Sequence, residues 1–212
     1  MSLADIIKQE KLIAILRGIP SDQIVDLAEA LYAGGIRLIE VTFDQKAADP
    51  QDTVKGIAEI SSKMKGRVRV GAGTVLSKEQ VRLAAEAGAE YIISPDTNRE
   101  VIEETKRLGL LSMPGAMTPS EIASAYRFGA DFVKVFPCSN LGPSYIKAVS
   151  APLSHIPLIA VGGVKPENEK DFLNAGACGV GAAGNMVNKE WLKNREFDKI
   201  TEVAKQFVDG LK

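Results

Sequence analysis

The stretch FGADFVKVFP, residues 128–137, decides the fold. Its first part, Phe-Gly-Ala-Asp, is typical of a helix that ends at a glycine C-cap and leads directly into a strand. Its second part is a short apolar run of aromatic and β-branched residues, which predicts a buried parallel strand. The same kind of junction recurs at 33–36, 87–90 and 175–178, and a further single glycine stands at Gly109. We therefore expect helices that alternate with parallel strands.

Helical patterns fill several of the intervals between the strand-like runs. In 22–33, the residues Ile24, Leu27 and Leu31 recur at helical spacing, and 78–87 and 99–108 follow the same pattern. The stretch TPSE at 118–121 predicts a helix start, because a threonine N-cap is followed by proline and by a glutamate that completes a capping box. A further helix start is expected at 165–168.

Eight strand-like runs fit this alternation. Eight strand–helix units in a chain of 212 residues are most economically arranged as a single (β/α)8 TIM barrel that covers residues 1–212, with a short amphipathic helix at its N-terminus. A doubly wound open sheet is the alternative, but eight units and the lack of a dinucleotide-binding fingerprint disfavour it. The expected strands are 12–16, 37–42, 69–72, 91–94, 110–113, 132–135, 158–161 and 179–182.

The composition excludes several classes of protein. The formal net charge is −1 and the isoelectric point is about 6.0, which argues against nucleic-acid binding as the function. No apolar stretch is long enough for a membrane span, and the N-terminus does not resemble a secretory signal. The two cysteines, Cys138 and Cys178, suggest neither a disulfide framework nor a zinc site, and His155 is the single histidine. We expect a cytoplasmic protein that binds neither nucleic acid nor membrane.

Two charged residues stand inside apolar, strand-like runs. Lys134 lies in the middle of DFVKVFP, and Glu40 lies in IRLIEVTF at 36–43. Burial of an unpaired charge costs several kcal/mol, so each residue calls for a reason. A lysine and a carboxylate near the ends of buried strands suggest covalent amine catalysis with a proton shuttle. A buried structural ion pair is the alternative interpretation.

Other unusual residues fall at the predicted carboxyl ends of the strands, where barrels carry their active sites. Arg17 follows the first run, Thr74 the third and Pro95 the fourth. The pair Gly162-Gly163 after the seventh run, together with Gly184 after the eighth, is typical of a backbone cradle for phosphate. Each also has a simpler explanation, since glycine and proline are common in turns and Thr74 fits a helix cap.

These residues together resemble the 2-keto-3-deoxy-6-phosphogluconate (KDPG) / 4-hydroxy-2-oxoglutarate (KHG) aldolase family. The resemblance runs over nearly the full length, and the order of its motifs is highly specific, although no single motif is. The motifs are ILRG (15–18), GGI (34–36), IEVT (39–42), GAGTVL (71–76), SP (94–95), MPG (113–115), TPSE (118–121) and KVFP (134–137).

The resemblance implies a class I aldolase that cleaves a 2-oxo acid to pyruvate and an aldehyde, as a homotrimer without a metal or another cofactor. It implies that Lys134 forms the Schiff base and that Glu40 is the general acid/base. It further implies that Thr74, Pro95 and Phe136 line the pocket for the pyruvoyl group.

Three positions depart from the family pattern. Asp44 stands where the family commonly has an arginine that holds the substrate carboxylate, and a reversed charge there would cost on the order of 1–4 kcal/mol at 4 Å. Three outcomes fit this change: Arg17 holds the substrate carboxylate in place of the family arginine, the Asp44 side chain turns away from the site, or the substrate differs. Val161 replaces a threonine of the phosphate loop, and Gly184 replaces a serine. The lyase chemistry is therefore the firmer prediction, and the phosphorylated substrate the weaker one.

Two other functions remain as alternatives at this point. A sugar-phosphate isomerase or epimerase would also place glycines after the last two strands, but it does not require a lysine at the end of the sixth. A non-catalytic barrel that binds a small acid fits the loss of the arginine, whereas intact Lys134, Glu40 and Thr74 argue against it. The charged residues near the C-terminus, Lys189 among them, are expected to form a solvated helix face, and 44–51 is expected to form a polar loop over the barrel mouth.

Overall fold

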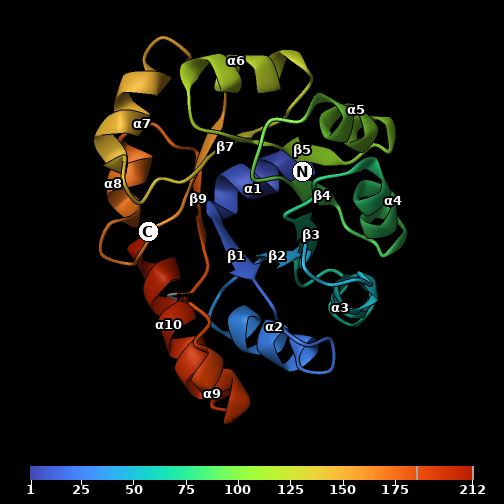
Figure 1. Ribbon diagram of the computed structural model, residues 1–212. Helices are drawn as coiled ribbons and strands as arrows, with labels where there is room; N and C mark the ends of the chain where they lie inside the picture. The colour runs from blue at the N-terminus through green and yellow to red at the C-terminus, as the bar shows by residue number, and fades with distance from the viewer. Residues whose placement is uncertain (185, 212) are drawn as a thin grey trace.

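The strands form one parallel sheet that closes on itself. We describe the fold from a computed structural model that covers residues 1–184 and 186–211 (Figure 1). The order of hydrogen-bonded neighbours is β5-β4-β3-β2-β1-β9-β8-β7-β6, and only Pro114 separates β5 from β6 along the chain. The two ends of the sheet are thus consecutive parts of the chain, which makes a barrel. The strands are β1 (Leu12–Leu16), β2 (Leu38–Thr42), β3 (Arg69–Gly73), β4 (Tyr91–Ile93), β5 (Leu111–Met113), β6 (Gly115–Ala116), β7 (Val133–Val135), β8 (Leu158–Val161) and β9 (Gly179–Ala182).

The expected (β/α)8 barrel is confirmed, and each of the eight predicted runs contains a strand. The fifth run differs because it is continued beyond Pro114 by the short β6. Proline has no N–H to donate to the ladder, so the strand is interrupted at this position. The Pro114 carbonyl still accepts a hydrogen bond from the Lys134 N–H at 2.9 Å, which ties the interruption to β7.

The predicted helix ends agree closely with the structure. Thr118 caps α6 in a capping box with Glu121, as expected. The five glycines that precede strands, Gly35, Gly88, Gly109, Gly129 and Gly176, all have positive φ, as left-handed caps require. The helices are α1 (Leu3–Glu10), α2 (Ile24–Ala33), α3 (Gln51–Lys63), α4 (Lys78–Glu86), α5 (Arg99–Arg107), α6 (Pro119–Arg127), α7 (Gly142–Ser150), α8 (Glu169–Asn174), α9 (Lys189–Lys193) and α10 (Phe197–Gly210).

The helix start expected at 165–168 is confirmed, since Asn168 is the N-cap of α8 and the helix begins at Glu169. The Asn168 side chain accepts a hydrogen bond from the Lys165 N–H at 2.8 Å and donates one to the Gly163 carbonyl at 3.0 Å. These bonds hold 165–168 as a turn. No helix N-terminus therefore follows directly on the glycine pair 162–163.

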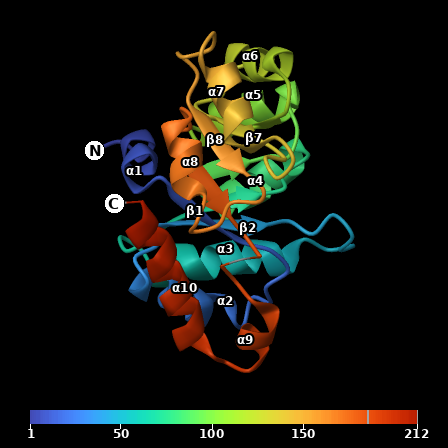
Figure 2. The same cartoon turned by 90° about the vertical axis from the view of Figure 1, so that its left-hand side faces the viewer.

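Two apolar cores surround and fill the barrel. The larger one lies between the strands and the outer helices, and α10 packs beside α2 on the outside (Figure 2). The smaller one fills the barrel interior with side chains such as Tyr91, Phe132 and Ile159. Helix α1 crosses the middle of the ring of strands, where Ile7 joins this interior core (Figure 1). The interior is therefore sealed at the N-terminal ends of the strands, so access is left to the carboxyl ends.

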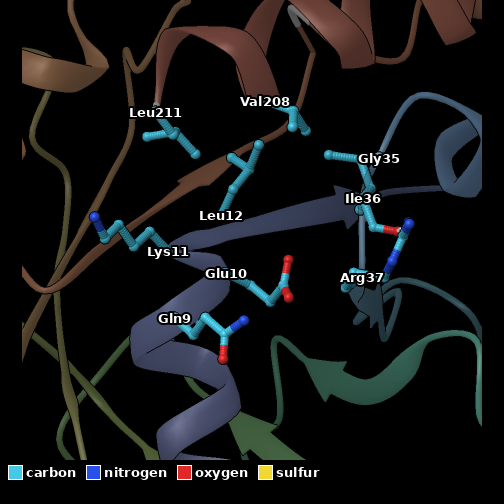
Figure 3. A pocket seen from close by; sticks show the side chains of 9 residues that line it. All are labelled: Gln9, Glu10, Lys11, Leu12, Gly35, Ile36, Arg37, Val208 and Leu211. Carbon is cyan, nitrogen blue, oxygen red and sulfur yellow. Dashed lines mark hydrogen bonds between the residues drawn. The ribbon is translucent and has the colours of Figure 1, made fainter.

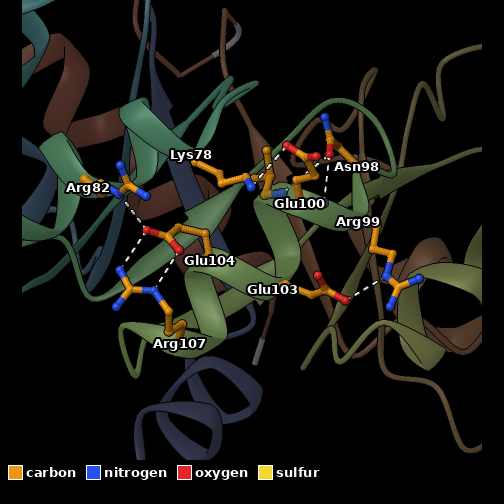
Figure 4. Close-up of polar contacts among 9 residues, drawn as sticks. Lys78, Arg82, Asn98, Arg99, Glu100, Glu103, Glu104 and Arg107 are labelled. Carbon is orange, nitrogen blue, oxygen red and sulfur yellow. Dashed lines mark hydrogen bonds and ion pairs between the residues drawn. The ribbon is translucent and has the colours of Figure 1, made fainter.

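Helices α4 and α5 are joined by a carboxylate between two arginines. Glu104 is 6 % exposed and accepts hydrogen bonds from Arg107 at 2.8 Å and from Arg82 at 2.7 Å (Figure 4). The hydrogen bonds from Arg107 and then Arg82 lower the pKa of this carboxyl from 4.5 to about 2. Its neighbour Glu103 pairs with Arg99 on the exposed side of the helix. Glu104 thus links the two helices by charge, in addition to the ion pair between Lys78 of α4 and Glu100 of α5 at 3.4 Å.

We expect Glu104→Gln to lower the melting temperature at pH 7 by more than Glu103→Gln does. Because the folded-state pKa of Glu104 is depressed, its stabilising effect is complete above about pH 4.5 and is lost as the pH falls toward about 2. The difference in melting temperature between wild type and Glu104→Gln should therefore shrink between pH 5 and pH 2.5, as measured by circular dichroism. An equal difference at both pH values would contradict this role of the ion pair.

The pKa of a second buried carboxyl, that of Glu169, is shifted upward, in the opposite direction to the pKa of Glu104. It is fully buried, both of its oxygens lack a hydrogen-bond partner in the described part of the chain, and a methyl group added at Gly210 would lie 2.0 Å from its Oε1. Burial, and then the nearby Glu167, raises the pKa of Glu169 from 4.5 to about 8. The folded protein thus holds a proton here that the unfolded chain releases above about pH 4.5.

We expect Glu169→Gln to stabilise the protein at pH 8.5, relative to wild type, by about 1–3 kcal/mol, since a buried unpaired charge is avoided. A raised carboxyl pKa makes wild-type stability fall as the pH rises from about 4.5 to 8, so the gain should vanish near pH 4.5. Urea unfolding at both pH values measures the effect, with Glu86→Gln, at an exposed residue of α4, as control. A gain of the same size at pH 4.5 would argue against titration of Glu169.

No helix in the described ranges is long and apolar enough to cross a membrane.

Candidate active site

Lys134 and Glu40 both point into the barrel. Side chains alternate along a strand, so Lys134 shares the inner face of β7 with Phe132, and Glu40 shares that of β2 with Leu38. Lys134 is 4 % exposed and Glu40 is 1 % exposed. The structure thus brings together the two charged residues that the sequence singled out, on strands far apart in the chain.

Gly73 provides the space for the Glu40 carboxylate. The last residues of β2 pair in register with β3, and a methyl group added at Gly73 would lie 1.8 Å from the Glu40 Oε1. This oxygen is buried and has no hydrogen-bond partner among the described residues. An unsatisfied buried acceptor costs about 1–3 kcal/mol, which a fold retains where the atom has a task. The site therefore offers one carboxylate oxygen that is free to exchange a proton.

The electrostatics favour the neutral forms of both groups. Burial lowers the pKa of Lys134, an effect that Glu40 opposes and Arg17 supports. Burial raises the pKa of Glu40, while the positive charges of Lys134 and Arg17 act against this shift. Desolvation by burial is the stronger influence on each group, and the attraction between the two charges is the weaker one. A buried lysine with a lowered pKa is what a nucleophilic amine requires.

Lys134 opens into a cavity of about 160 Å³ at the carboxyl ends of β1, β7, β8 and β9. The Lys134 Nζ lies 4.8 Å from the centroid of the Phe136 ring, which forms one wall. Arg17 extends from the end of β1 into the same cavity. The remaining predicted residues that line it are Gly162, Gly163 and Gly184.

The two loop glycines at 162 and 163 are required by the backbone. Both have positive φ, 103° and 73°, and a methyl group at Gly163 would lie 2.9 Å from the Ser139 Cα. Gly184 is different, because it is exposed and has open space around it. The predicted cradle thus keeps its glycines, and the helix behind it begins at Glu169 after the turn at 165–168.

Thr74 and Pro95 lie outside this cavity, at the ends of β3 and β4 on the same side of the barrel. Thr74 has a left-handed φ of 55°, and its carbonyl accepts a hydrogen bond from the Gln45 side chain at 2.7 Å. The Pro95 backbone abuts Gly115, where an added methyl group would lie 2.3 Å from the Pro95 carbonyl. Both are half-buried. The structure therefore groups them with the site but not in the compartment that contains Lys134 and Arg17.

Asp44 is directed away from Lys134. It lines a separate cavity of about 210 Å³ together with Asp49 and Asp52, and its Oδ1 accepts a hydrogen bond from the Lys46 N–H at 2.9 Å. The segment between β2 and α3 that carries Asp44 projects from the body of the molecule (Figure 2). Of the three outcomes considered for this position, the structure agrees with an aspartate that turns away.

The family described as KDPG and KHG aldolase matches residues 3–203. The chain belongs to this family. It is 36 % identical over 198 residues to the 2-dehydro-3-deoxy-6-phosphogalactonate aldolase of Escherichia coli, a match that covers 93 % of this chain and 92 % of the relative. It is 32 % identical over 189 residues to the KHG/KDPG aldolase of the same organism, over 89 % of this chain and 86 % of the relative. The predicted resemblance is confirmed.

A solved structure agrees with the membership. The KDPG aldolase from Legionella pneumophila, with pyruvate captured as a covalent carbinolamine intermediate, superposes with a TM-score of 0.85 at 26 % identity, over 97 % of each chain. The protein is therefore a carbon–carbon lyase of the class I aldolase type, which favours this prediction over the isomerase and the non-catalytic barrel.

A further cavity, of about 150 Å³, lies at the opposite end of the aldolase barrel (Figure 3). Glu10 and Lys11 at the end of α1 line it together with Arg37. The Arg37 guanidinium is already bound, since it donates hydrogen bonds to the carbonyls of Tyr32 and Ile36 at 3.1 and 2.9 Å. Neither Lys134 nor Glu40 reaches this cavity, so it is separate from the candidate active site.

Within the described ranges, no group of three or more histidine, cysteine, aspartate or glutamate residues could hold a metal ion.

Sequence reasoning missed two residues near the site. Gly73 was noted only as part of a motif, although its lack of a side chain makes room for Glu40. Lys189 was expected on a solvated face and is exposed, but it also lines a second cavity beside the first. The position of Gly73 at a strand end could have indicated its role. Nothing in the charged stretch around 189 distinguished Lys189 from its neighbours.

Proposed function

We propose that the aldolase cleaves a 2-keto-3-deoxy-6-phosphoaldonate or 4-hydroxy-2-oxoglutarate to pyruvate and an aldehyde, through a Schiff base on Lys134. The observation that carries this proposal is the buried amine of Lys134 beside Glu40, whose Oε1 has no partner among the described residues. The names of the relatives support these substrate classes, and the E. coli phosphogalactonate aldolase favours a phosphoaldonate.

The reaction follows from the chemistry of the two side chains. The neutral Lys134 Nζ attacks C2 of the 2-oxo acid, and loss of water from the carbinolamine gives an iminium ion. The iminium withdraws the electron pair of the C3–C4 bond, while Glu40, directly or through one water, takes the proton of the C4 hydroxyl. The bond breaks and the aldehyde leaves. The enamine then takes a proton at C3, and water hydrolyses the iminium to pyruvate and free Lys134.

Other residues are assigned to binding. Arg17 shares the cavity with Lys134, and we assign it to the substrate carboxylate because Asp44 faces elsewhere. Phe136 forms a wall beside the amine, and we assign Thr74 and Pro95 to the pyruvoyl end, as the family resemblance implies. Gly162, Gly163 and Gly184 offer backbone at the opposite side of the cavity.

The assembly and location are part of the same proposal. The family resemblance supports a homotrimer in which residues 1–212 form one domain, and the cysteine usage and composition support a cytoplasmic location.

A coupled assay for pyruvate release tests the substrate class. We expect release from 2-keto-3-deoxy-6-phosphogalactonate, from its gluconate epimer or from 4-hydroxy-2-oxoglutarate, each followed through lactate dehydrogenase and the oxidation of NADH. Failure to release pyruvate from all three would contradict the proposed function.

A further inference from the structure

We propose that Lys189 is a specificity-determining residue that binds the anionic far end of the substrate, in a second compartment of the active site. The proposal rests on the function proposed above and adds to it the residue that distinguishes substrates with an anionic far end from those whose far end is neutral. It is carried by the position of Lys189 in the cavity next to that of Lys134 and by the distribution of charge in these two cavities.

The two cavities adjoin at the barrel mouth. The second has a volume of about 150 Å³, and both share Ile15, Arg17, Ala183 and Gly184 as lining residues. Lys134 lines the first cavity and Lys189 the second, with Arg17 at the boundary. A substrate attached to Lys134 can therefore extend past Arg17 into the second cavity.

The Lys189 side chain reaches across the mouth toward the loop after β1. Lys189 is the first residue of α9, whose start is fixed by Asn188: the Asn188 side chain accepts a hydrogen bond from the Glu190 N–H at 2.8 Å. A methyl group added at Gly18 would lie 3.9 Å from the Lys189 Nζ. The ammonium thus lies at the cavity, near the loop after β1.

Of the three cationic side chains that line the two cavities, Lys189 is the one available to bind the far end of the substrate. Lys134 must be neutral in order to attack, and Arg17 is assigned to the carboxylate next to the reacting carbonyl. Lys189 is exposed and has no ion-pair partner within the residues that the structure describes. The rest of the second cavity is largely apolar, with Ile19 and Val187 in its wall, which strengthens an ionic contact made there.

The glycine loop supplies less binding to an anion than expected. The Lys165 N–H already donates to Asn168, and Gly184 offers no hydroxyl. A side-chain cation is therefore the group that can compensate for a phosphate or a carboxylate at the far end. A lysine ammonium binds either group as a point charge.

Steady-state kinetics of Lys189→Met test the assignment, with three kinds of substrate: a 6-phosphoaldonate, 4-hydroxy-2-oxoglutarate, and the same aldonate without phosphate. Methionine keeps most of the apolar stem and removes the charge. Lys193→Met, at the exposed end of the same helix, is the matched control. We expect Lys189→Met to raise KM roughly 5- to 30-fold for a substrate with an anionic far end, with kcat nearly unchanged and with the aldonate that lacks the phosphate unaffected.

Comparison of the two anionic substrates shows which group, phosphate or carboxylate, Lys189 binds. A larger effect on the phosphoaldonate assigns Lys189 to phosphate, and a larger effect on 4-hydroxy-2-oxoglutarate assigns it to carboxylate. Equal KM values in wild type and Lys189→Met for both anionic substrates, or the same increase in Lys193→Met, would overturn the assignment. Borohydride trapping with pyruvate separates this failure from that of the proposed function. If the wild-type protein forms the trapped pyruvate adduct, only the role of Lys189 is contradicted. If it does not, both the role of Lys189 and the proposed function are contradicted.

Discussion

Lys134→Met is expected to reduce kcat for pyruvate release by roughly 10⁴-fold or more, because no other group can form the Schiff base. Lys134 is 4 % exposed, so methionine, with a similar apolar length and no charge, fits the site. Burial lowers the pKa of Lys134, which means that the folded protein disfavours its charged form. Loss of the amine should therefore leave the melting temperature unchanged or raise it.

The measurement combines the pyruvate-release assay with thermal unfolding followed by circular dichroism. Lys147→Met in α7, away from the cavity, serves as the control for a lysine-to-methionine change and should keep wild-type activity. A Lys134→Met variant that is folded and retains more than about a hundredth of the wild-type rate would contradict the covalent mechanism.

Glu40→Gln is expected to lower kcat by roughly 10²–10⁴-fold, the range for loss of a general acid/base. Glutamine occupies the same volume over Gly73, where an added methyl group would lie 1.8 Å from the Glu40 Oε1, so the barrel should keep its packing. The amide cannot exchange a proton with the carbinolamine or with the C4 hydroxyl. Since the amine of Lys134 remains, the variant should still form the pyruvate adduct, but more slowly.

Single-turnover kinetics with pyruvate and borohydride separate the two effects. The rate of adduct formation should fall in Glu40→Gln, while the final yield on Lys134 approaches that of wild type. Glu90→Gln, at a surface ion pair with Arg69, is the control and should leave both unchanged. An unaltered kcat in Glu40→Gln would assign proton transfer to another group.

The fold could be predicted from sequence because local signals agreed with the tertiary arrangement. Glycine caps such as Gly129 and Gly176 marked where helices end, and the apolar runs marked strands that are buried on both faces. At 165–168 the predicted helix start is present, but its first residues form a turn in which the Asn168 side chain bonds to Lys165 and Gly163 before α8 begins at Glu169. Competition between a side chain and the backbone for the same hydrogen bonds is not visible in the pattern of apolar residues.

The candidate site was partly predictable for the same reason. Lys134 and Glu40 were conspicuous because a charge inside an apolar strand is costly unless it has a use. The direction of Asp44 depends on how the loop after β2 folds, which the sequence does not specify. Lys189 lies in a charged stretch where most side chains are solvated, and only the closure of the barrel brings it beside Arg17.

Reduction by borohydride in the presence of pyruvate, followed by peptide mass spectrometry, tests the central claim most directly. The account predicts a reduced pyruvoyl adduct on the peptide that contains Lys134, and none in Lys134→Met. Folded wild-type protein without an adduct, or with the adduct on a different lysine, would contradict the assignment of the Schiff base to Lys134.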